Sequence, residues 1–230
     1  VAPDAPLGLA LSAPARKIRG VKLQLDGRAL RTSGRRGRWT ASVGPKAFAD
    51  GDTHTLLVTA TPRRGLYFNA PDEGYPNRPV QVWTQGQAED SACYFPCFDF
   101  PGEKFTTEML ATVPASWFAL SNGRLVEVTE NKRRKTKTYH WAQEIPHPAY
   151  LVTLVAGEFD VVEDDADGVP IQYYGRPGTA DDLRRVGHLQ VDDARAARRR
   201  DGEHDRAQGA GRHRAQVVEA FAAGVRAARP

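Results

Sequence analysis

Short segments in which apolar and polar residues alternate recur along most of this chain. Alternation with a period of two residues is typical of a β-strand with two distinct faces, so each segment predicts a strand. The predicted strands cover residues 21–25, 54–60, 80–87, 106–113, 117–120 and 169–174. Residues 26–27 (Asp-Gly) and 121–123 (Ser-Asn-Gly) are typical of turns. Residues 124–129 and 136–142 are predicted to form a hairpin whose tip is the basic segment 130–135.

Short strands at this spacing predict a mainly β fold class, an antiparallel, saddle-shaped and sandwich-like sheet domain. Other segments lack the alternation. Residues 1–20 are expected to be a loose N-terminal segment, residues 32–38 a basic solvated turn and residues 163–168 an acidic turn. From residue 191 onward Ala, Arg, Gly and Asp dominate, and a short irregular or helical C-terminal tail is expected. Its helical candidate, residues 215–228, has only a thin apolar stripe.

Length and composition limit the classes of protein that fit. The 230 residues suit one domain with part of a second, and 40% hydrophobic residues are enough for a buried core. No apolar run approaches the length of a membrane span, so no membrane partner is expected. The net charge of +4 is small, and the basic runs 132–137 and 195–200 contain no aromatic residue. No nucleic-acid partner is therefore expected.

The strand predicted over residues 80–87 places Gln85 and Gln87 on one face together with Trp83. An amide oxygen on that face can accept a hydrogen bond from an ammonium group. On the alternation alone, two glutamines on a solvated strand face are the simpler interpretation. A functional interpretation depends on the surrounding motifs.

Two motifs surround this pair of glutamines, T-Q-G-Q-A at residues 84–88 and F-P-C-F-D-F-P at residues 95–101. Together they resemble the amino-terminal domain of the zinc aminopeptidases of the aminopeptidase N and leukotriene hydrolase family. The similarity continues in residues 62–68, 104–106, 119–123 and 150–159. Under this resemblance, residues 21–162 are an aminopeptidase N-like β domain. Residues 163–230 are then the incomplete start of a catalytic domain.

The resemblance implies that this domain recognises substrate for a peptidase that removes amino-terminal residues from peptides. Gln87 matches the residue that helps to bind the free α-amino group of the peptide, and Gln85 lies beside it. Both are therefore expected to be substrate-binding residues. The expected partners are the catalytic domain of the same polypeptide and peptide substrates with a free amino terminus.

The chain departs from the family within the same block. Relatives usually carry an arginine where this chain has Ala92, and an acidic or polar residue where it has Phe100. Asp99 lies between aromatic residues and is expected to cap a turn rather than to act in catalysis.

Metal ligands and catalytic residues are not expected in this chain. None of its six histidines belongs to an H-E-x-x-H sequence, and G-A-M-E-N does not occur. His140, on a predicted strand, and His147, between prolines, are expected to be surface or capping residues. Zinc is expected only in the full-length family member, and the chain alone is predicted to be inactive.

The two cysteines, Cys93 and Cys97, are expected to be buried free thiols. In an extended segment their Cα atoms would be about 13 Å apart, which is beyond disulfide reach. A structural zinc site would need a second pair of ligands. A reducing, cytoplasmic location is the resulting expectation.

Two other hypotheses remain open. A non-catalytic β-sandwich binding module is the alternative function, because this fold class hosts many unrelated functions. The chain begins at Val1 and is expected to be a fragment or a processed product. Residues 190–193 resemble the segment that precedes G-A-M-E-N in relatives, and codons for residues 199–204 can encode G-A-M-E-N-M in a shifted frame. A frameshifted reading is therefore one hypothesis for the Ala/Arg-rich tail.

Overall fold

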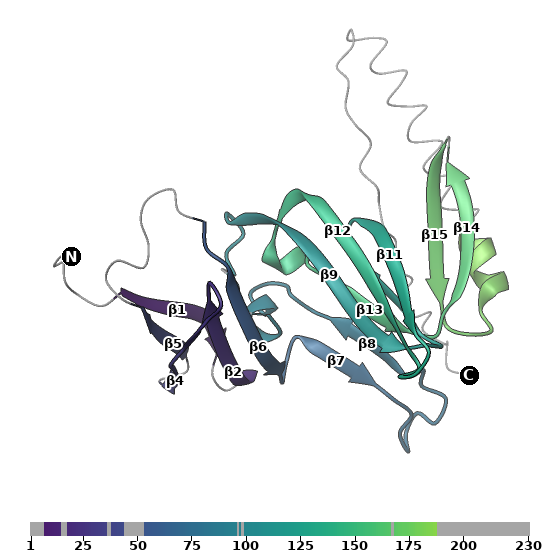
Figure 1. The fold of residues 1–230 in the computed structure, drawn as a ribbon. Coiled ribbons are helices and arrows are strands. Elements are labelled where there is room, and N and C mark those ends of the chain that lie inside the picture. The colour runs from purple at the N-terminus through teal and green to yellow at the C-terminus, as the bar shows by residue number, and fades with distance from the viewer. Residues whose placement is uncertain are drawn as a thin grey trace, which may run out of the picture. The chain divides into compact units, whose positions relative to one another are not determined.

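The protein is described by a computed structural model of residues 7–14, 18–35, 38–43, 53–95, 97, 99–166 and 168–187. All strand pairs in this part of the chain are antiparallel, and one short helical segment covers residues 180–187 (Figure 1). The predicted fold class, mainly β with antiparallel sheets, is confirmed, whereas the tail expected from residue 191 onward lies outside the described residues. Within the described ranges no helix is both long and apolar enough to cross a membrane.

Two compact units divide the chain, Val1–Gly157 and Glu158–Pro230. Unit 1 begins with two three-stranded sheets, whose orders are β1-β5-β4 and β3-β2-β6. Their strands are β1 (Leu7–Pro14), β2 (Ile18–Leu25), β3 (Arg28–Leu30), β4 (Thr32–Arg35), β5 (Arg38–Val43) and β6 (Leu56–Pro62). The division into domains that was expected at residue 162 stays a prediction.

A small hydrophobic core holds this first part of unit 1 together. Ile18, Val21 and Leu23 of β2 are buried with Ala41 of β5, and Leu56 packs against them. The predicted strand at residues 21–25 and the turn at residues 26–27 are both present, because the alternating side chains of β2 give it one buried face.

Two segments that the sequence analysis read as irregular form strands. Leu7–Pro14, expected to be loose, is β1, and residues 32–38, expected to be a turn, contain β4 and the first residue of β5. The strand β5 lies between β1 and β4 and pairs with both. Strands pair through backbone hydrogen bonds, which do not require side chains to alternate, so the sequence pattern did not predict these strands.

The second part of unit 1 contains a four-stranded sheet, β10-β13-β8-β7, and a three-stranded sheet, β11-β12-β9. Two 3-10 helices, η1 and η2, lie in its connections. The elements are β7 (Leu66–Asn69), β8 (Gln81–Thr84), η1 (Ser91–Cys93), β9 (Lys104–Pro114), β10 (Phe118–Ser121), β11 (Arg124–Asn131), β12 (Thr136–Pro148), η2 (Ala149–Leu151) and β13 (Leu154–Gly157). The predicted hairpin of β11 and β12 and the predicted strands β9 and β10 are confirmed.

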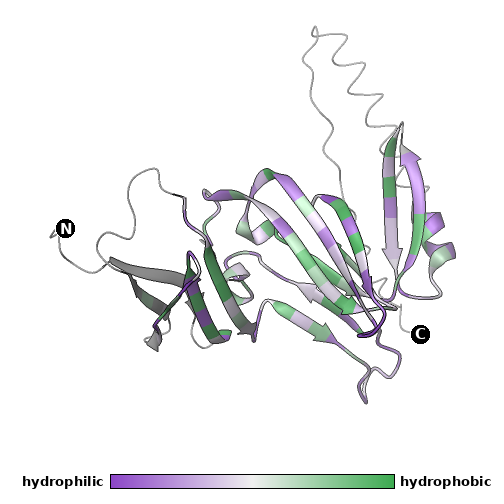
Figure 2. Cartoon of the chain, viewed as in Figure 1, coloured by the Kyte–Doolittle hydropathy of each residue, from purple (hydrophilic) through white to green (hydrophobic). Residues whose placement is uncertain are grey.

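Aromatic side chains join these two sheets. Phe118 of β10 makes edge-to-face contacts with Tyr139 and Trp141 of β12, at ring-centroid distances of 5.0 and 6.4 Å. The indole N–H of Trp141 donates a hydrogen bond to the carbonyl oxygen of Ala119 over 2.9 Å. Hydrophobic and hydrophilic residues alternate along β9 and β12 (Figure 2), so that one face of this sheet packs against the four-stranded sheet.

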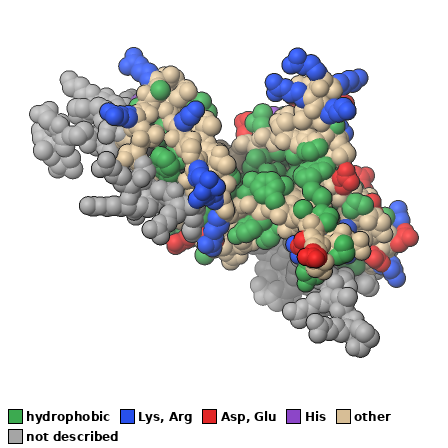
Figure 3. Space-filling view, turned by 90° about the horizontal axis from the view of Figure 1, so that it is seen from below, with side chains coloured by type: hydrophobic (Ala, Val, Ile, Leu, Met, Phe, Trp, Pro, Cys, Tyr) green, Lys and Arg blue, Asp and Glu red, His purple; other side chains and the backbone are tan. Residues whose placement is uncertain are grey.

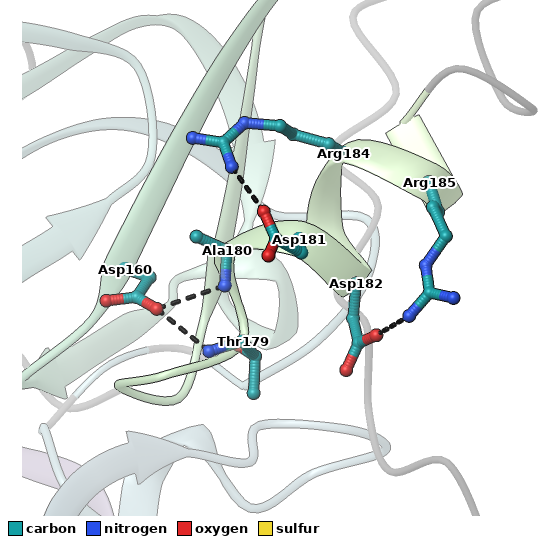
Figure 4. Close-up of polar contacts among 7 residues, drawn as sticks. All are labelled: Asp160, Thr179, Ala180, Asp181, Asp182, Arg184 and Arg185. Carbon is teal, nitrogen blue, oxygen red and sulfur yellow. Dashed lines mark hydrogen bonds and ion pairs between the residues drawn. The ribbon is translucent and has the colours of Figure 1, made fainter.

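Unit 2 contains a two-stranded ribbon of β14 (Asp160–Ala166) and β15 (Val169–Gly175), followed by the helical segment 180–187. The Asp160 carboxylate accepts hydrogen bonds from the backbone N–H groups of Thr179 and Ala180 over 2.8 and 3.1 Å (Figure 4). It therefore caps the start of the helical segment.

The acidic residues that were expected to form a turn at residues 163–168 lie mostly in β14. Asp164 and Asp165 pair with Ile171 and Pro170 of β15, and the turn is confined to the end of the segment at Gly168. Residues 215–228 and the proposed frameshift region lie outside the described residues.

Candidate functional site

The two predicted site glutamines lie beyond the end of β8 rather than within it. The strand stops at Thr84, which corrects the prediction of a strand over residues 80–87. The carbonyl oxygen of Gly86 accepts a hydrogen bond from the backbone N–H of Asp90 over 2.9 Å, and this bond closes a turn. Gln87 lies at the exposed tip of that turn, so it does not share a strand face with Gln85. Residues 85–90 are called the glutamine loop below.

The side chain of Gln85 contacts the backbone of Gln87. Its side-chain Nε2 donates a hydrogen bond to the carbonyl oxygen of Gln87 over 3.3 Å. Both side chains are exposed, as are Ala88 and Glu89. The structure therefore brings the two predicted residues together, with Gln85 holding the backbone of the turn and the Gln87 amide facing solvent.

The base of the glutamine loop is fully packed. Gly86 is buried, and a Cβ atom added to it would lie 2.5 Å from Ser91 Oγ and 2.9 Å from the carbonyl oxygen of Tyr150. The Ser91 hydroxyl is buried and donates to the carbonyl oxygen of Ala149 over 2.9 Å. The loop is thus pressed against η2, and only glycine fits at position 86 without displacing its neighbours.

Residues after η2 support the same region. The Tyr94 hydroxyl donates a hydrogen bond to the carbonyl oxygen of Val152 over 2.6 Å, and burial raises the pKa of Tyr94 well above its ordinary value. The backbone N–H of Leu154 donates to Thr84 Oγ1 over 2.9 Å at the end of β8. These bonds fix the position from which the glutamine loop departs.

The bend between β6 and β7 holds the other side of the loop. The backbone N–H of Gln85 donates to the carbonyl oxygen of Gly65 over 2.9 Å. The Arg64 guanidinium forms an ion pair with the Asp90 carboxylate, with 2.7 Å between Nη2 and Oδ2. The side chain of Asp90 is only 16% exposed, whereas that of Arg64 is 50% exposed. This hydrogen bond and ion pair to Asp90 raise the pKa of Arg64 above its usual value.

Asp99 acts as a capping carboxylate, as predicted. Its Oδ2 accepts a hydrogen bond from the backbone N–H of Ala92 in η1 over 3.0 Å. Burial is the main cause of a raised Asp99 pKa, and the negative charges of Glu89 and Asp90 raise it further. Ala92 itself is buried, so this position contributes a backbone donor and a small apolar side chain.

Both cysteines are free thiols, as expected. Cys93 is buried, and its Sγ donates to the Asp90 carboxylate over 3.5 Å. Cys97 is half-buried, and burial raises its pKa to about 12, so it is a thiol at neutral pH. The extended geometry assumed for these residues is wrong, because η1 turns the chain at residues 91–93.

The described histidines take part in structural contacts. His140 Nε2 lies 3.0 Å from Glu108 Oε2 on the exposed face of the β9–β12 pair. His147, expected at the surface or as a capping residue, is instead buried, and its ring packs against Phe105 at 5.9 Å between centroids. Within the part of the chain that the structure describes, no group of three or more His, Cys, Asp or Glu residues could hold a metal ion. These residues therefore do not fit a zinc centre.

Several large hydrophobic side chains of unit 1 are exposed. Phe68 of β7 is 73% exposed, and Tyr75 and Phe100 are each 65% exposed. Figure 3 shows hydrophobic side chains gathered across one face of the molecule, with Lys and Arg mainly toward its margins. Apolar surface of this kind is typical of a contact with another protein surface.

Sequence reasoning did not identify Arg64, Ser91 or Tyr94 as supports of the loop. Each forms its bond with a residue far away in sequence, 26 positions for Arg64 and 58 for the other two. Periodicity and local turn chemistry carry no signal for such contacts.

Comparisons with known proteins agree on one kind of domain. Residues 54–151 match the peptidase M1 N-terminal domain. The TFIID subunit 2 of Danio rerio, a transcription initiation factor, is 36% identical over 105 residues, covering 45% of this chain and 9% of that protein. Aminopeptidase M1 of Arabidopsis thaliana is 39% identical over 128 residues, covering 55% of this chain and 14% of that protein. Aminopeptidase RNPEPL1 of Mus musculus is 31% identical over 120 residues, covering 52% of this chain and 16% of that protein.

Solved structures show the same fold. An M1 zinc metallopeptidase from Deinococcus radiodurans, crystallised as a mutant with a Tyr-Ser-Ala substrate, superposes with a TM-score of 0.56 at 22% identity. The match covers 75% of this chain and 41% of the peptidase chain. Another structure of an M1 zinc metallopeptidase from Deinococcus radiodurans gives a TM-score of 0.53 at 21% identity. This chain therefore spans only a part of each of these similar proteins.

Proposed function

Because residues 54–151 form an N-terminal domain of the M1 aminopeptidase family, we propose that this chain recognises substrate for a zinc-dependent metallo-aminopeptidase. The observation that carries the proposal is the exposed Gln87 amide at the tip of a turn whose base is buried. In this function, the Gln87 side-chain oxygen accepts a hydrogen bond from the α-ammonium group of a peptide. Gln85 keeps the backbone of the turn in place.

The rigidity of the loop base supports this role. A binding group that is already ordered loses less conformational entropy when its ligand arrives. Gly86 and Ser91 pack against η2, and the backbone N–H of Gln85 is hydrogen-bonded to Gly65. The residues on both sides of the Gln87 tip are therefore held in place. A neutral amide discriminates a charged amino terminus from an acetylated one, because the acetylated group has a weaker donor.

The proposed partner is a catalytic domain in the same polypeptide. This chain covers 41% of the similar metallopeptidase structure and 9 to 16% of three curated relatives, which leaves most of each protein outside the match. The exposed Phe68, Tyr75 and Phe100 would then be covered by protein. Zinc belongs to that catalytic domain in this proposal, since the described residues do not fit a metal centre.

A peptide titration tests the proposal. The isotope-labelled chain is titrated by NMR with a tripeptide amide that has a free amino terminus and with its N-acetylated form. We expect the Gln87 side-chain amide and the backbone amides of the glutamine loop to shift only with the free form, and Gln87→Ala to abolish the shifts of the backbone amides. Gln172→Ala is the matched control, because its exposed side chain bonds Glu163 in unit 2. Equal chemical-shift changes with both peptides would contradict the proposed recognition of the ammonium group.

A non-catalytic binding module is the second candidate function. Its support is the 36% identity over 105 residues to a subunit of a transcription initiation factor. The coding sequence on both sides of this chain separates the two functions. H-E-x-x-H and G-A-M-E-N in any downstream frame favour the peptidase, and unrelated downstream sequence favours the module.

We also propose a reducing, cytoplasmic location. Two free thiols that lie in one short segment support it. Cell fractionation combined with thiol labelling of the unfolded protein tests this location, and recovery of oxidised protein from a secreted fraction would contradict it.

A further inference from the structure

Both ends of the glutamine loop are held by two consecutive residues of another segment. Gly65 accepts the backbone hydrogen bond from Gln85 at the start of the loop, and Arg64 binds the Asp90 carboxylate at its end. The bond from the Asp90 N–H to the Gly86 carbonyl oxygen closes the turn between these two points. The Arg64–Gly65 pair therefore clamps the loop on both sides of the Gln87 tip.

The end of the loop that Arg64 holds is rich in negative charge. Glu89 and Asp90 are close enough to Asp99 to raise its pKa, after the larger effect of burial. Asp90 is itself shielded, and its Oδ1 also accepts from Cys93. A shielded carboxylate beside other carboxylates is unfavourable unless a cation compensates its charge. Arg64 supplies that cation from the bend between β6 and β7.

The compensating cation comes from outside the glutamine loop. The nearby Ala92 is buried and donates only its backbone N–H to Asp99. The guanidinium that faces the Asp90 carboxylate is that of Arg64. Because half of the Arg64 side chain is exposed, the ion pair lies beside the exposed tip and not in the core.

We propose that Arg64 is a positioning residue that acts through Asp90 to fix the orientation in which the turn presents the Gln87 amide. The inference rests on the proposed recognition of a free amino terminus. Arg64 itself makes no contact with the peptide in this account. Its effect is transmitted through the closure of the turn, which depends on Asp90 being held in place.

A purely structural role would have different consequences. A partly exposed ion pair contributes little to the free energy of unfolding, because solvent screens it. Loss of Arg64 should therefore leave the unfolding midpoint nearly unchanged while it loosens the loop. Local opening of this kind is measured by amide hydrogen exchange, which reports individual hydrogen bonds.

The test compares Arg64→Ala with Arg64→Lys and with Arg78→Ala. Arg78 pairs with Asp72 over 2.9 Å in a separate turn, so it controls for the loss of an exposed ion pair. In Arg64→Ala we expect exchange of the Asp90 amide to accelerate by about tenfold or more, with little change in the core strands. We expect Arg64→Lys to restore slow exchange in part, since a lysine keeps the charge without the planar fork. Arg78→Ala should leave Asp90 exchange unchanged.

Titration with the free-amino tripeptide amide separates this inference from the proposed function. If Gln87→Ala weakens binding and Arg64→Ala leaves both binding and Asp90 exchange unchanged, the inference is overturned while the proposed function stands. If the wild-type chain does not distinguish the free from the acetylated peptide, the proposed function fails and the inference fails with it. Uniformly faster exchange in all strands of Arg64→Ala would assign Arg64 to general stability and would also overturn the inference.

Discussion

The carbonyl oxygen of Tyr150 lies 2.9 Å from the point that a Cβ on Gly86 would occupy. These residues belong to segments far apart in the sequence, and their contact sets how closely the glutamine loop packs against η2. Ser91 Oγ lies closer still to the same point, at 2.5 Å. The glycine of T-Q-G-Q-A is therefore required by packing, whereas the glutamines that flank it are exposed.

Substitution of this glycine should destabilise unit 1. In Gly86→Ala the added methyl group must displace η2 or Ser91, and overpacking of this kind costs typically about 1–3 kcal/mol. Urea unfolding measures the change. Gly74→Ala is the control, because a Cβ there would meet only Asp72 Oδ1 at an ordinary 3.5 Å, and its effect should stay within about 0.5 kcal/mol. Equal stabilities of the two variants would contradict the packing argument.

The comparison of β8 with its prediction shows what alternation can and cannot reveal. Residues 81–84 were recognisable as a strand because side chains of different kinds alternate there with a period of two. The end of the strand was not, because it depends on contacts of Gly86 with Ser91 and Tyr150 that no local pattern encodes. Gln87 was found from its motif, but its place on a turn came only from the fold.

A similar limit applies to residues that act by long-range pairing. Arg64 reads only as the second of two adjacent arginines, and its ion pair becomes visible only when the fold places Asp90 beside it. Asp99 was predicted as a cap from local turn chemistry, and the backbone N–H of Ala92 confirms it. The strand β1 was missed because its partner β5 was not predicted as a strand, and only the first residue of β5, Arg38, fell within a segment read as a turn.

Removal of the Gln87 amide should weaken peptide binding without unfolding the chain. A hydrogen bond to a charged group contributes about 1.5–3 kcal/mol, so Gln87→Ala should raise the Kd for a free-amino peptide roughly ten- to a hundredfold. The side chain is exposed, so the unfolding midpoint should be unchanged. Isothermal titration calorimetry measures the Kd. An unchanged Kd would contradict the binding role and leave Gln87 as a solvated surface residue.

The turn between β2 and β3 should contribute to stability at neutral pH and lose that contribution in acid. Hydrogen bonds from the Thr55 backbone N–H and from His54 hold the pKa of Asp26 below its usual value. A group with a depressed folded-state pKa stabilises the protein above its unfolded pKa, about 3.9, and loses this contribution as the pH falls through the folded pKa. Asp26→Asn should flatten the acid side of the stability profile in urea unfolding between about pH 2 and 6. An unchanged slope would show that Asp26 does not contribute.

Asp99 should have the opposite pH dependence. Burial and neighbouring carboxylates raise its pKa, so the folded state holds the proton more tightly than the unfolded chain. Stability from this group is then present below the unfolded pKa and falls as the pH rises through the folded pKa. Asp99→Asn keeps an acceptor for the Ala92 N–H, and it should remove this loss at neutral pH. The measurement is the change in the free energy of unfolding that Asp99→Asn causes at each pH. If the substitution is less favourable at pH 7 than at pH 4, the assignment is contradicted.

The isolated chain should bind no stoichiometric zinc and should hydrolyse no aminoacyl substrate. Hydrolysis with zinc needs three protein ligands, an open position on the metal and a base near it. The described residues contain no group of three suitable ligands, and the whole sequence contains no H-E-x-x-H. Metal analysis after dialysis and a fluorogenic aminoacyl assay measure both quantities, with a chelator-treated sample as the control. One equivalent of tightly bound zinc together with turnover that the chelator abolishes would show that residues outside the described ranges complete a catalytic centre.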